Sequence, residues 1–315
     1  MPGDTAILRE ERAREVSSVQ SQASLPSYPH LHDLMTRYRL ENLVSVSAES
    51  FTERIHGFLT VGDHAIKGCE DPCKQIHKAV DFQWGHHHDF GAFGVPGRMC
   101  KHHMSILSVF IDEIGALSHC LDGLRVLDIG PWTGGTSLLL CAMGAEVVAV
   151  EEVKQYSDCL DYMRHAFGIR TLECRNLSLF DCTTPDFQDA FDVVLLAGVL
   201  HHLSDPKLAL RILFNCLQNG GKCLIETLAT DPRQLAKAHA PSASSQDGAQ
   251  LDVPWNAMLF TPENLAAMMT GVGYEVVQPC RAIRYKTPHC RLFAVGQRTT
   301  HVDLRRNGLS VRSIR

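Results

Sequence analysis

The sequence has no long hydrophobic run, no apolar leader and no excess of positive charge. None of its apolar stretches approaches the ~20 residues that a membrane-spanning helix needs, so we expect no transmembrane helix and no membrane partner. Residues 1–22 mix glutamate with arginine, which is unlike a secretory or organellar leader. The net charge of −5 disfavours a nucleic-acid partner without excluding one, because proteins that bind nucleic acids usually present a basic face.

Cysteine is abundant, with 12 residues in the chain. Several of these cysteines lie inside apolar runs or expected helices, where they act as small hydrophobic side chains. With no export signal, we expect reduced thiols and a cytoplasmic location. The cysteines in such positions are Cys141, Cys159, Cys174, Cys216 and Cys223.

The most informative feature that the chain does contain is a glycine-rich turn between two buried strands. The apolar run Leu124 to Ile129 predicts a parallel strand, which is followed by Gly130 and a helix that closes at Gly144. The run Val147 to Val150 predicts a second strand, and Glu151 ends it. This order is typical of a nucleoside-binding unit, in which glycine lets the backbone approach the ligand and the carboxylate accepts both ribose hydroxyls.

The turn differs from the dinucleotide-binding pattern G-x-G-x-x-G, because position 132 is a tryptophan. The order Asp128, Gly130, Trp132, Gly134 instead resembles motif I of the class I S-adenosylmethionine (SAM)-dependent methyltransferases, D-x-G-x-G-x-G. The resemblance implies SAM as the cofactor. A Rossmann-like unit without SAM is the alternative, since glycine-rich turns recur across α/β folds.

A second motif follows at the expected distance. Phe191 to Leu196 reads as another buried strand and leads into Gly198 to Pro206, which resembles the fourth-strand motif GVLxHLxDP of the same superfamily. An amphipathic helix from Lys207 to Leu217 and a strand from Cys223 to Thr227 come next. The resemblance implies an α/β fold with a Rossmann-like, doubly wound, mostly parallel seven-stranded sheet and a helical N-terminal extension.

The chain divides into four parts in this interpretation. Residues 1–26 are a disordered tail, and residues 27–119 form a helical substrate or lid segment. Residues 120–298 form the SAM-binding domain, with a lid insertion at 228–253, and residues 299–315 are a C-terminal tail. Ser47 to Phe58 and Ser105 to Cys120 are expected helices, Phe82 to Lys101 an expected loop, and Glu275 to Tyr285 an expected strand.

Within the superfamily, the residues resemble the tRNA wobble-uridine methyltransferases and their small-molecule relatives. That subgroup reads D-[IV]-G-x-W-[DT]-G at the turn and carries W-x-H-x-x-D-[LF]-G upstream, where this chain has Trp84 to Gly91. The resemblance covers about residues 82–298. Gly85 replaces a usual aromatic residue, and His87 and His88 replace small polar and aliphatic residues, which puts a tRNA substrate in doubt more than the cofactor.

The resemblance also implies which residues hold the cofactor. Four residues of the turn would line the methionine part of SAM, and an acidic residue would take the ribose hydroxyls. Two residues after an expected strand from Thr171 to Arg175 would flank the adenine, and a glycine would lie beside the sulfonium. The residues at the methionine part are Asp128, Gly130, Trp132 and Gly134, and the residue at the ribose is Glu151. Asn176 and Leu177 are those at the adenine, and Gly198 is the glycine beside the sulfonium.

Methyl transfer requires a base only when the acceptor atom is protonated, and histidine suits that role because its pKa lies near neutrality. Candidates are grouped in the upstream segment and at the end of the fourth strand. The alternative for the second group is that it packs against or caps the next helix. The catalytic candidates are His86, His87, His88 and Asp89 in the first group, and His201 and His202 in the second.

Clustered histidines also allow two metal alternatives, one from His86 to Asp89 together with His102 and His103, and one at His64, Cys69, Cys73 and His77. Adjacent residues of an extended chain point apart, and zinc sites usually show closer cysteine pairs, so we expect no metal. We expect a SAM-dependent methyltransferase that acts on a small-molecule O, N or S acceptor. A tRNA-modifying methyltransferase and a non-catalytic SAM-binding protein are the alternatives, and nothing in the sequence indicates an oligomeric state.

Overall fold

The computed structural model describes residues 28–60, 64–65, 79–80, 82–229, 259–284 and 290–299. The predicted tails, nearly all of the predicted lid and the pattern His64, Cys69, Cys73, His77 therefore lie outside the residues whose side chains are described. Within the described residues, no helix combines the length and the apolar character that crossing a bilayer requires.

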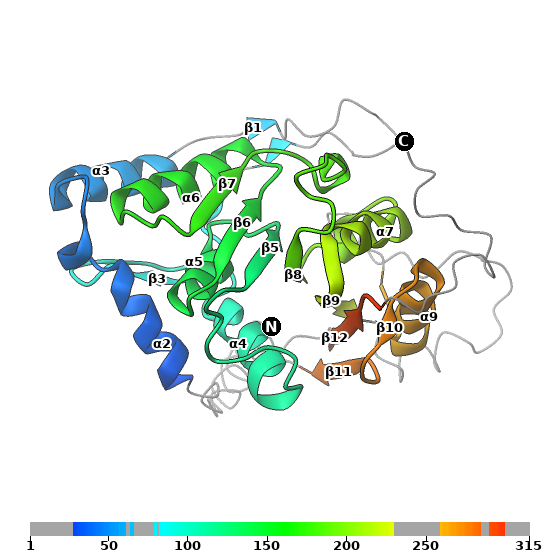
Figure 1. Ribbon diagram of the computed structural model, residues 1–315. Coiled ribbons are helices and arrows are strands. Elements are labelled where there is room, and N and C mark those ends of the chain that lie inside the picture. The colour runs from blue at the N-terminus through cyan, green and yellow to red at the C-terminus, as the bar shows by residue number, and fades with distance from the viewer. Residues whose placement is uncertain are drawn as a thin grey trace, which may run out of the picture.

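A central sheet organises the chain (Figure 1), and its strands follow the order β7-β6-β5-β8-β9-β12-β10, with β11 also paired to β12. The first five strands of this order run parallel, and β12 lies antiparallel to β9. The strands are β5 (Arg125–Ile129), β6 (Glu146–Val150), β7 (Leu172–Arg175), β8 (Phe191–Ala197), β9 (Leu217–Ala229), β10 (Glu275–Val276), β11 (Arg281–Arg284) and β12 (Cys290–Gln297).

Helices cover both faces of the sheet, which confirms the doubly wound architecture. Alternate residues of a strand point to opposite faces, so Val147 packs with one set of helices and Val148 with the other. The first face carries α2 (Pro29–Met35), α3 (Ala48–Leu59), α4 (His102–Ser108), α5 (Gly135–Ala142) and α6 (Lys154–Ala166), and the second carries α7 (Pro206–Cys216) and α9 (Pro262–Val272).

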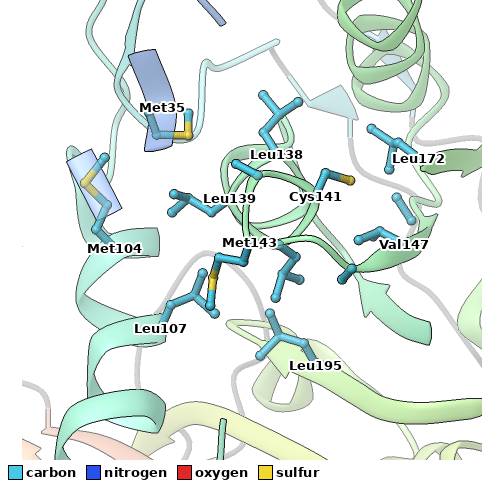
Figure 2. Close-up of a cluster of buried hydrophobic side chains, with 14 of the residues drawn as sticks. Met35, Met104, Leu107, Leu138, Leu139, Cys141, Met143, Val147, Leu172 and Leu195 are labelled. Carbon is cyan, nitrogen blue, oxygen red and sulfur yellow. The ribbon is translucent and has the colours of Figure 1, made fainter. Parts of the chain in front are cut away.

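The N-terminal extension is built into the core. Figure 2 shows Met35 of α2 and Met104 of α4 near Leu139 of α5, and Leu195 of β8 closes the same apolar cluster. Tyr38 reaches the same helix and donates its hydroxyl to the Leu138 carbonyl at 2.7 Å. The first face of the sheet is thus buried by residues from both the extension and the Rossmann-like unit.

Helix starts follow the local sequence. Ser47 caps α3 by accepting from the Ser50 N–H, and Asp205 caps α7 immediately before Pro206. Thr261 and Asn264 form a reciprocal capping box at α9. These caps explain why the predicted helices at Ser47 and Lys207 agree with the structure to within one residue.

Three local predictions were only partly right. The helix expected at 105–120 is α4 followed by a π-helical turn, Val109–Glu113. The expected loop at 82–101 contains a short hairpin of β3 (His88–Asp89) and β4 (Gly94–Val95). The strand expected at 275–285 is split into β10 and β11, which gives the sheet an eighth strand.

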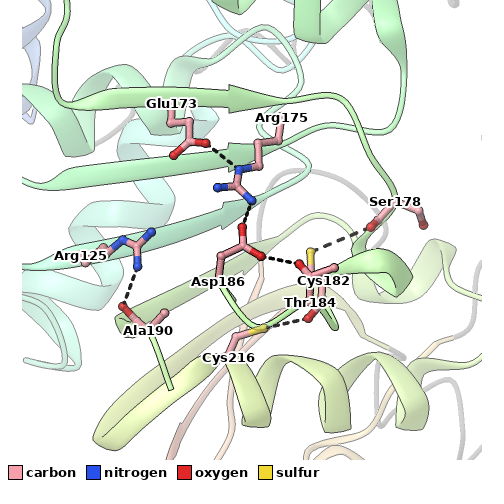
Figure 3. Close-up of polar contacts among 9 residues, drawn as sticks. All are labelled: Arg125, Glu173, Arg175, Ser178, Cys182, Thr184, Asp186, Ala190 and Cys216. Atoms are coloured by element: carbon pink, nitrogen blue, oxygen red, sulfur yellow. Dashed lines mark hydrogen bonds and ion pairs between the residues drawn. The ribbon is translucent and has the colours of Figure 1, made fainter. Parts of the chain in front are cut away.

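Polar contacts secure the edge of the sheet at β7 (Figure 3). Arg175 forms ion pairs with Glu173, at 2.7 Å, and with Asp186. Nearby, the Cys216 thiol contacts the Cys182 carbonyl oxygen at 3.5 Å. The described cysteines are free, and burial raises the pKa of the Cys182 thiol to about 12, which makes this thiol a poor nucleophile at neutral pH.

Two further strands, β1 (His64–Ala65) and β2 (Ala79–Val80), pair antiparallel with each other.

Candidate active site

The glycine turn after β5 is shaped by packing within the protein. Gly130 and Gly134 adopt φ values of 67° and 84°. A Cβ atom at Gly130 would lie 2.5 Å from a methyl carbon of Val199, and one at Gly134 would lie 2.3 Å from Leu160. Both positions therefore require glycine for internal reasons, in addition to any approach of a ligand.

Asp128 joins the strand to the helix that follows the turn. Its buried carboxylate accepts hydrogen bonds from the hydroxyls of Thr136, at 2.7 Å, and Ser137, at 2.6 Å. Burial raises the pKa of Asp128 to about 6, although both hydroxyls act in the opposite direction. The carboxylate therefore fixes the start of α5 against β5.

Glu151 lies at the end of β6 and faces the turn. One carboxylate oxygen accepts the Trp132 N–H and the other accepts the Val153 N–H, each at 3.0 Å. Burial raises the pKa of Glu151 to about 7. A carboxylate has about four acceptor positions, so about two remain for a ligand.

The ends of β6 and β7 are tied together beside Glu151. The Asn176 amide donates to the carbonyl oxygens of Glu151, at 2.9 Å, and Glu152, at 3.0 Å. Leu177, the next residue, is partly buried against the apolar cluster on the second face. The two residues expected to flank adenine thus lie at the carboxyl edge of the sheet, next to Glu151.

The upstream segment packs directly onto the glycine turn. The N–H groups of Gly85 and His86 point at the Thr133 hydroxyl oxygen, at 3.1 and 3.4 Å. A Cβ atom at Gly85 would lie 2.4 Å from the Trp132 ring, and one at Gly135 would lie 2.8 Å from Nδ1 of His86. The glycine at position 85 is therefore the partner of Trp132, which the sequence alone did not indicate.

Alternate residues of the upstream segment point in opposite directions. His86 and His88 are 8% and 1% exposed and face the interior. Asp89 is partly exposed, where it pairs with Arg39 at 2.7 Å and accepts the Gly91 N–H. His87 is half-buried on the outer side. The structure thus separates the four predicted catalytic residues of this segment into two pairs.

The inward histidines join His103, the second residue of α4. The ring centroids of His86 and His103 are 4.7 Å apart, and the His88 ring stacks on His103 at 6.5 Å. Burial lowers the pKa of His86 to about 3 and of His88 to about 4, and it holds the pKa of His103 well below its usual range. All three imidazoles are therefore uncharged near neutral pH.

Several nitrogens of this cluster have no hydrogen-bond partner within the described residues: Nδ1 of His86, Nε2 of His88, and both nitrogens of His103. The Trp84 indole N–H donates to Nδ1 of His88 at 2.9 Å. The same Nδ1 also lies 2.9 Å from the His86 carbonyl oxygen, which can only accept a hydrogen bond. Unpaired buried polar groups cost about 1–3 kcal/mol each, so a hydrogen-bonding partner at this cluster, a water molecule or a ligand, would lower its free energy.

A buried ion pair lies next to the histidines. Glu226 of β9 and Arg291 of β12 form a bidentate pair, with Nη2 and Oε2 2.7 Å apart, and His102 lies 3.5 Å from the same carboxylate. Burial acts to raise the pKa of Glu226, but Arg291 and His102 outweigh it and lower the pKa to about 2. Arg291 also approaches Gly198, since a Cβ atom there would lie 3.7 Å from Nη2.

His201 and His202 lie after β8, with ring centroids 4.0 Å apart. Nδ1 of His201 accepts the Leu228 N–H at 3.4 Å and contacts the Thr227 hydroxyl at 3.1 Å. The proton of neutral His201 therefore resides on Nε2. Burial lowers the pKa of His201 to about 2 and of His202 to about 4, so both rings are uncharged.

The sequence marks His103 only as a potential metal ligand, and it does not indicate Glu226 or Arg291 as site residues. His103 follows His102 directly, and two consecutive histidines are only a weak sign of a functional site. The Glu226–Arg291 pair has no signal in the sequence, because its partners are 65 residues apart and meet only when β9 pairs with β12.

Among the described residues, the histidines of the upstream segment do not converge as metal ligands. A different group of side chains in the described part of the chain does place its potential ligand atoms close together. It consists of His30, Asp112 and His119, whose ligand atoms all lie within 4.8 Å of one another.

Comparison with known proteins agrees with this geometry. The model of a family described as a methyltransferase domain matches residues 101–279, more than half of the chain. The chain therefore belongs to this methyltransferase family, and the resemblance to class I SAM-dependent methyltransferases is confirmed, with SAM as the cofactor.

Individual relatives differ in the acceptor that their names state. The tRNA U34 carboxymethyltransferase of Alteromonas mediterranea is 30% identical over 174 residues, 53% of this chain and 49% of the relative. The ubiquinone biosynthesis O-methyltransferase of Cereibacter sphaeroides is 31% identical over 116 residues, 37% of this chain and 46% of the relative. The chain thus spans about half the length of the curated relatives that it matches.

Among solved structures, the 1,6-didemethyltoxoflavin-N1-methyltransferase of Burkholderia thailandensis is 18% identical, with a TM-score of 0.47 over 62% of this chain and 78% of that one.

The residues at the carboxyl edge of the sheet fit SAM. The first turn of α5 has no side-chain cap, so its N–H groups are open to a carboxylate such as that of the methionine part. Glu151 retains acceptor capacity for ribose hydroxyls, and Gly198 provides a backbone position with φ 73° and no side chain.

Proposed function

We propose that the chain transfers a methyl group from SAM to an oxygen, nitrogen or sulfur atom of a small-molecule acceptor. The observation that carries this proposal is the cluster of buried, uncharged imidazoles at His86 and His103, which lies against the glycine turn. A neutral imidazole takes a proton from a hydroxyl, amine or thiol, and these acceptors need a base.

On the cofactor side, Glu151 holds the ribose, and Asn176 and Leu177 border the adenine. The uncapped first turn of α5, with Gly130, Trp132 and Gly134, receives the methionine part, and Asp128 keeps that turn in place. Bound SAM supplies an activated methyl group on a sulfonium, so the protein contributes mainly alignment and exclusion of water.

On the acceptor side, His86 is the base. His86 would take the proton that the acceptor atom loses when the methyl group is transferred to it. His201 carries a proton on Nε2 and donates a hydrogen bond to an acceptor oxygen, and His88 lines the same cluster beside His103. The Glu226–Arg291 pair forms a rigid polar wall beside Gly198.

Burial favours a small acceptor over a folded RNA. The histidine cluster is almost fully enclosed within the described residues, and the net charge of −5 does not supply the basic face that phosphate binding uses. The A. mediterranea relative is named for a tRNA acceptor, and that substrate is the competing outcome of the test below.

The test is to incubate the purified chain with methyl-labelled SAM and two separate acceptor fractions, low-molecular-weight cell extract and bulk tRNA. We expect label in the small molecules, absent for His86→Ala and retained for His165→Ala, which changes an exposed histidine on α6. Label in tRNA alone would overturn the small-molecule acceptor, and no transfer to either fraction despite SAM binding would favour the non-catalytic alternative.

A further inference from the structure

A second group of potential ligands lies away from the proposed active site. His30 of α2, Asp112 of the π-helical turn and His119 of the following segment come from three separate places in the sequence. Their ligand atoms lie within 4.8 Å of one another, and Nε2 of His119 is already 3.4 Å from Oδ1 of Asp112. In a tetrahedral zinc site the ligand atoms lie about 3.4 Å apart, given bonds of about 2.1 Å.

The three side chains are held by anchors in the core. His30 precedes the fully buried Leu31, and His119 lies between the buried residues Leu117 and Leu121. Their backbone positions are therefore fixed by burial, while the side chains themselves remain exposed.

Asp112 is oriented by its own neighbours. The Ser108 hydroxyl donates to Oδ2 of Asp112 at 2.6 Å, which leaves Oδ1 directed at His119. The next residue, Glu113, forms an ion pair with Arg281 of β11 at 2.7 Å. Such outer contacts orient the ligands of metal sites, and π-helical turns often occur at functional positions.

The rings of His30 and His119 lie close together on the surface. Their ring centroids are 4.8 Å apart, with the planes at 74°. By contrast, His165 and Asp161 of α6 form an exposed pair, 3.7 Å apart, without a third ligand. The group at His30 therefore differs from an ordinary exposed ion pair by a second imidazole.

We propose that His30, Asp112 and His119 bind a divalent transition metal of the zinc class. Two imidazoles and a carboxylate match the preferences of such ions, whereas Mg²⁺ prefers oxygen ligands alone. The three protein ligands leave a coordination position for water. The bound ion fastens α2 of the extension to the segment that leads into β5 (Figure 1).

The position of the site gives this link a consequence. His103 is near the start of α4, and Asp112 lies in the π-helical turn that continues it. A metal at His30, Asp112 and His119 therefore steadies the far end of the helical stretch that carries His103. This inference concerns stability and does not rest on the proposed methyl transfer.

The experiment uses the full chain, stripped of metal with a chelator and titrated with Zn²⁺, and with Mg²⁺ in parallel. Each of three variants should either bind one Zn²⁺ fewer than the unaltered chain or bind it at least tenfold more weakly. The variants are His30→Ala, Asp112→Asn and His119→Ala. His165→Ala should bind as the unaltered chain does. Zn²⁺ should also slow amide exchange in α2 of the unaltered chain, and Mg²⁺ should not.

All three ligands are exposed, so circular dichroism should show that the variants fold. Unchanged zinc stoichiometry and affinity in the three variants would overturn the proposal, even if zinc binds at another place in the chain. Zinc binding that is lost equally in His165→Ala would also overturn it.

Discussion

The polar groups buried at the glycine turn and those buried in the histidine cluster are satisfied in different ways. Asp128 and Glu151 each accept two hydrogen bonds from neighbouring residues of the Rossmann-like unit. Nitrogens of His86, His88 and His103 have no partner within the described residues. The two carboxylates of the first region are therefore partnered within the protein, whereas the second region bears an energetic cost that a bound molecule can relieve.

This difference separates structure from chemistry. The turn keeps its shape without a ligand, because glycines, hydroxyls and backbone N–H groups already fit together there. The histidine cluster combines burial with open lone pairs and open donors, which is the state expected of groups that act on an acceptor. Substitutions at the turn should therefore lower stability more than turnover, and substitutions in the histidine cluster should lower turnover more than stability.

The largest effect is expected at the turn. Gly130→Ala adds a Cβ atom 2.5 Å from Val199 at a φ of 67°, so both overpacking and backbone strain oppose it. Each of these costs about 1–3 kcal/mol, and urea denaturation should show a loss of about 2–6 kcal/mol together with loss of SAM binding.

Gly123→Ala is the matched control for Gly130→Ala. Gly123 has a φ of 77°, but a Cβ atom there meets no other atom within 4 Å. It should lose only the strain contribution, about 1–3 kcal/mol. Equal losses in the two variants would mean that Val199 does not restrict the turn.

Glu151→Ala should weaken SAM binding by about 1–3 kcal/mol, because charged hydrogen bonds to the ribose are lost. Glu146→Ala, at the exposed opposite end of β6, should leave the affinity unchanged. Calorimetric titration with SAM measures both variants. An unaltered affinity in a folded Glu151→Ala protein would remove Glu151 from the cofactor site.

The same carboxylate predicts how pH affects SAM binding. The pKa of Glu151 is raised to about 7, above its usual value of 4.5, so the free folded protein holds this proton more tightly than the unfolded chain does. Stability from this group is therefore lost as pH rises from about 4.5 to 7. SAM needs the ionised form, so affinity should rise by up to about tenfold between pH 6 and 8, and it should not do so in Glu151→Gln.

Elements whose signal is local were predicted well from the sequence. The expected strand 147–150 is β6 at 146–150, and the expected helix 207–217 is α7 at 206–216, because alternation, caps and proline fix them nearby. The confirmed family and cofactor followed from the residues of the turn, whose order is also local.

The contacts of the histidine segment could not be predicted in this way. A run of histidines indicates a candidate site but not which side chains are buried, and His86 is buried because its backbone packs on Thr133, 47 residues later in the chain. Gly85 departs from the family pattern, and the structure explains why, because the Trp132 ring occupies the space that a side chain at position 85 would need. His103 joins the cluster only through the packing of α4 on α5, which no local pattern encodes.

Within the upstream segment, the inward and outward residues should differ in their effect on turnover. His86→Ala removes the proposed base and should lower turnover at least about tenfold while SAM still binds. Asp89→Ala removes a partly exposed contact to Arg39 and should change turnover less than about twofold. Steady-state rates with parallel SAM titrations measure this, and equal losses in both variants would contradict the inward–outward division.

The smallest effect, and the most direct test of the comparison, is expected at His103. His103→Leu replaces a buried imidazole that has two unpartnered nitrogens by an apolar side chain. Because the free protein no longer buries those nitrogens, its free energy of unfolding should stay the same or rise by about 1 kcal/mol, while turnover falls. His87→Leu, on the half-buried outer side, should give no such gain. Urea denaturation of both variants without ligand provides the measurement. A loss of more than about 2 kcal/mol in His103→Leu would mean that the imidazole already has a partner in the free protein, and the two regions would then not differ as described.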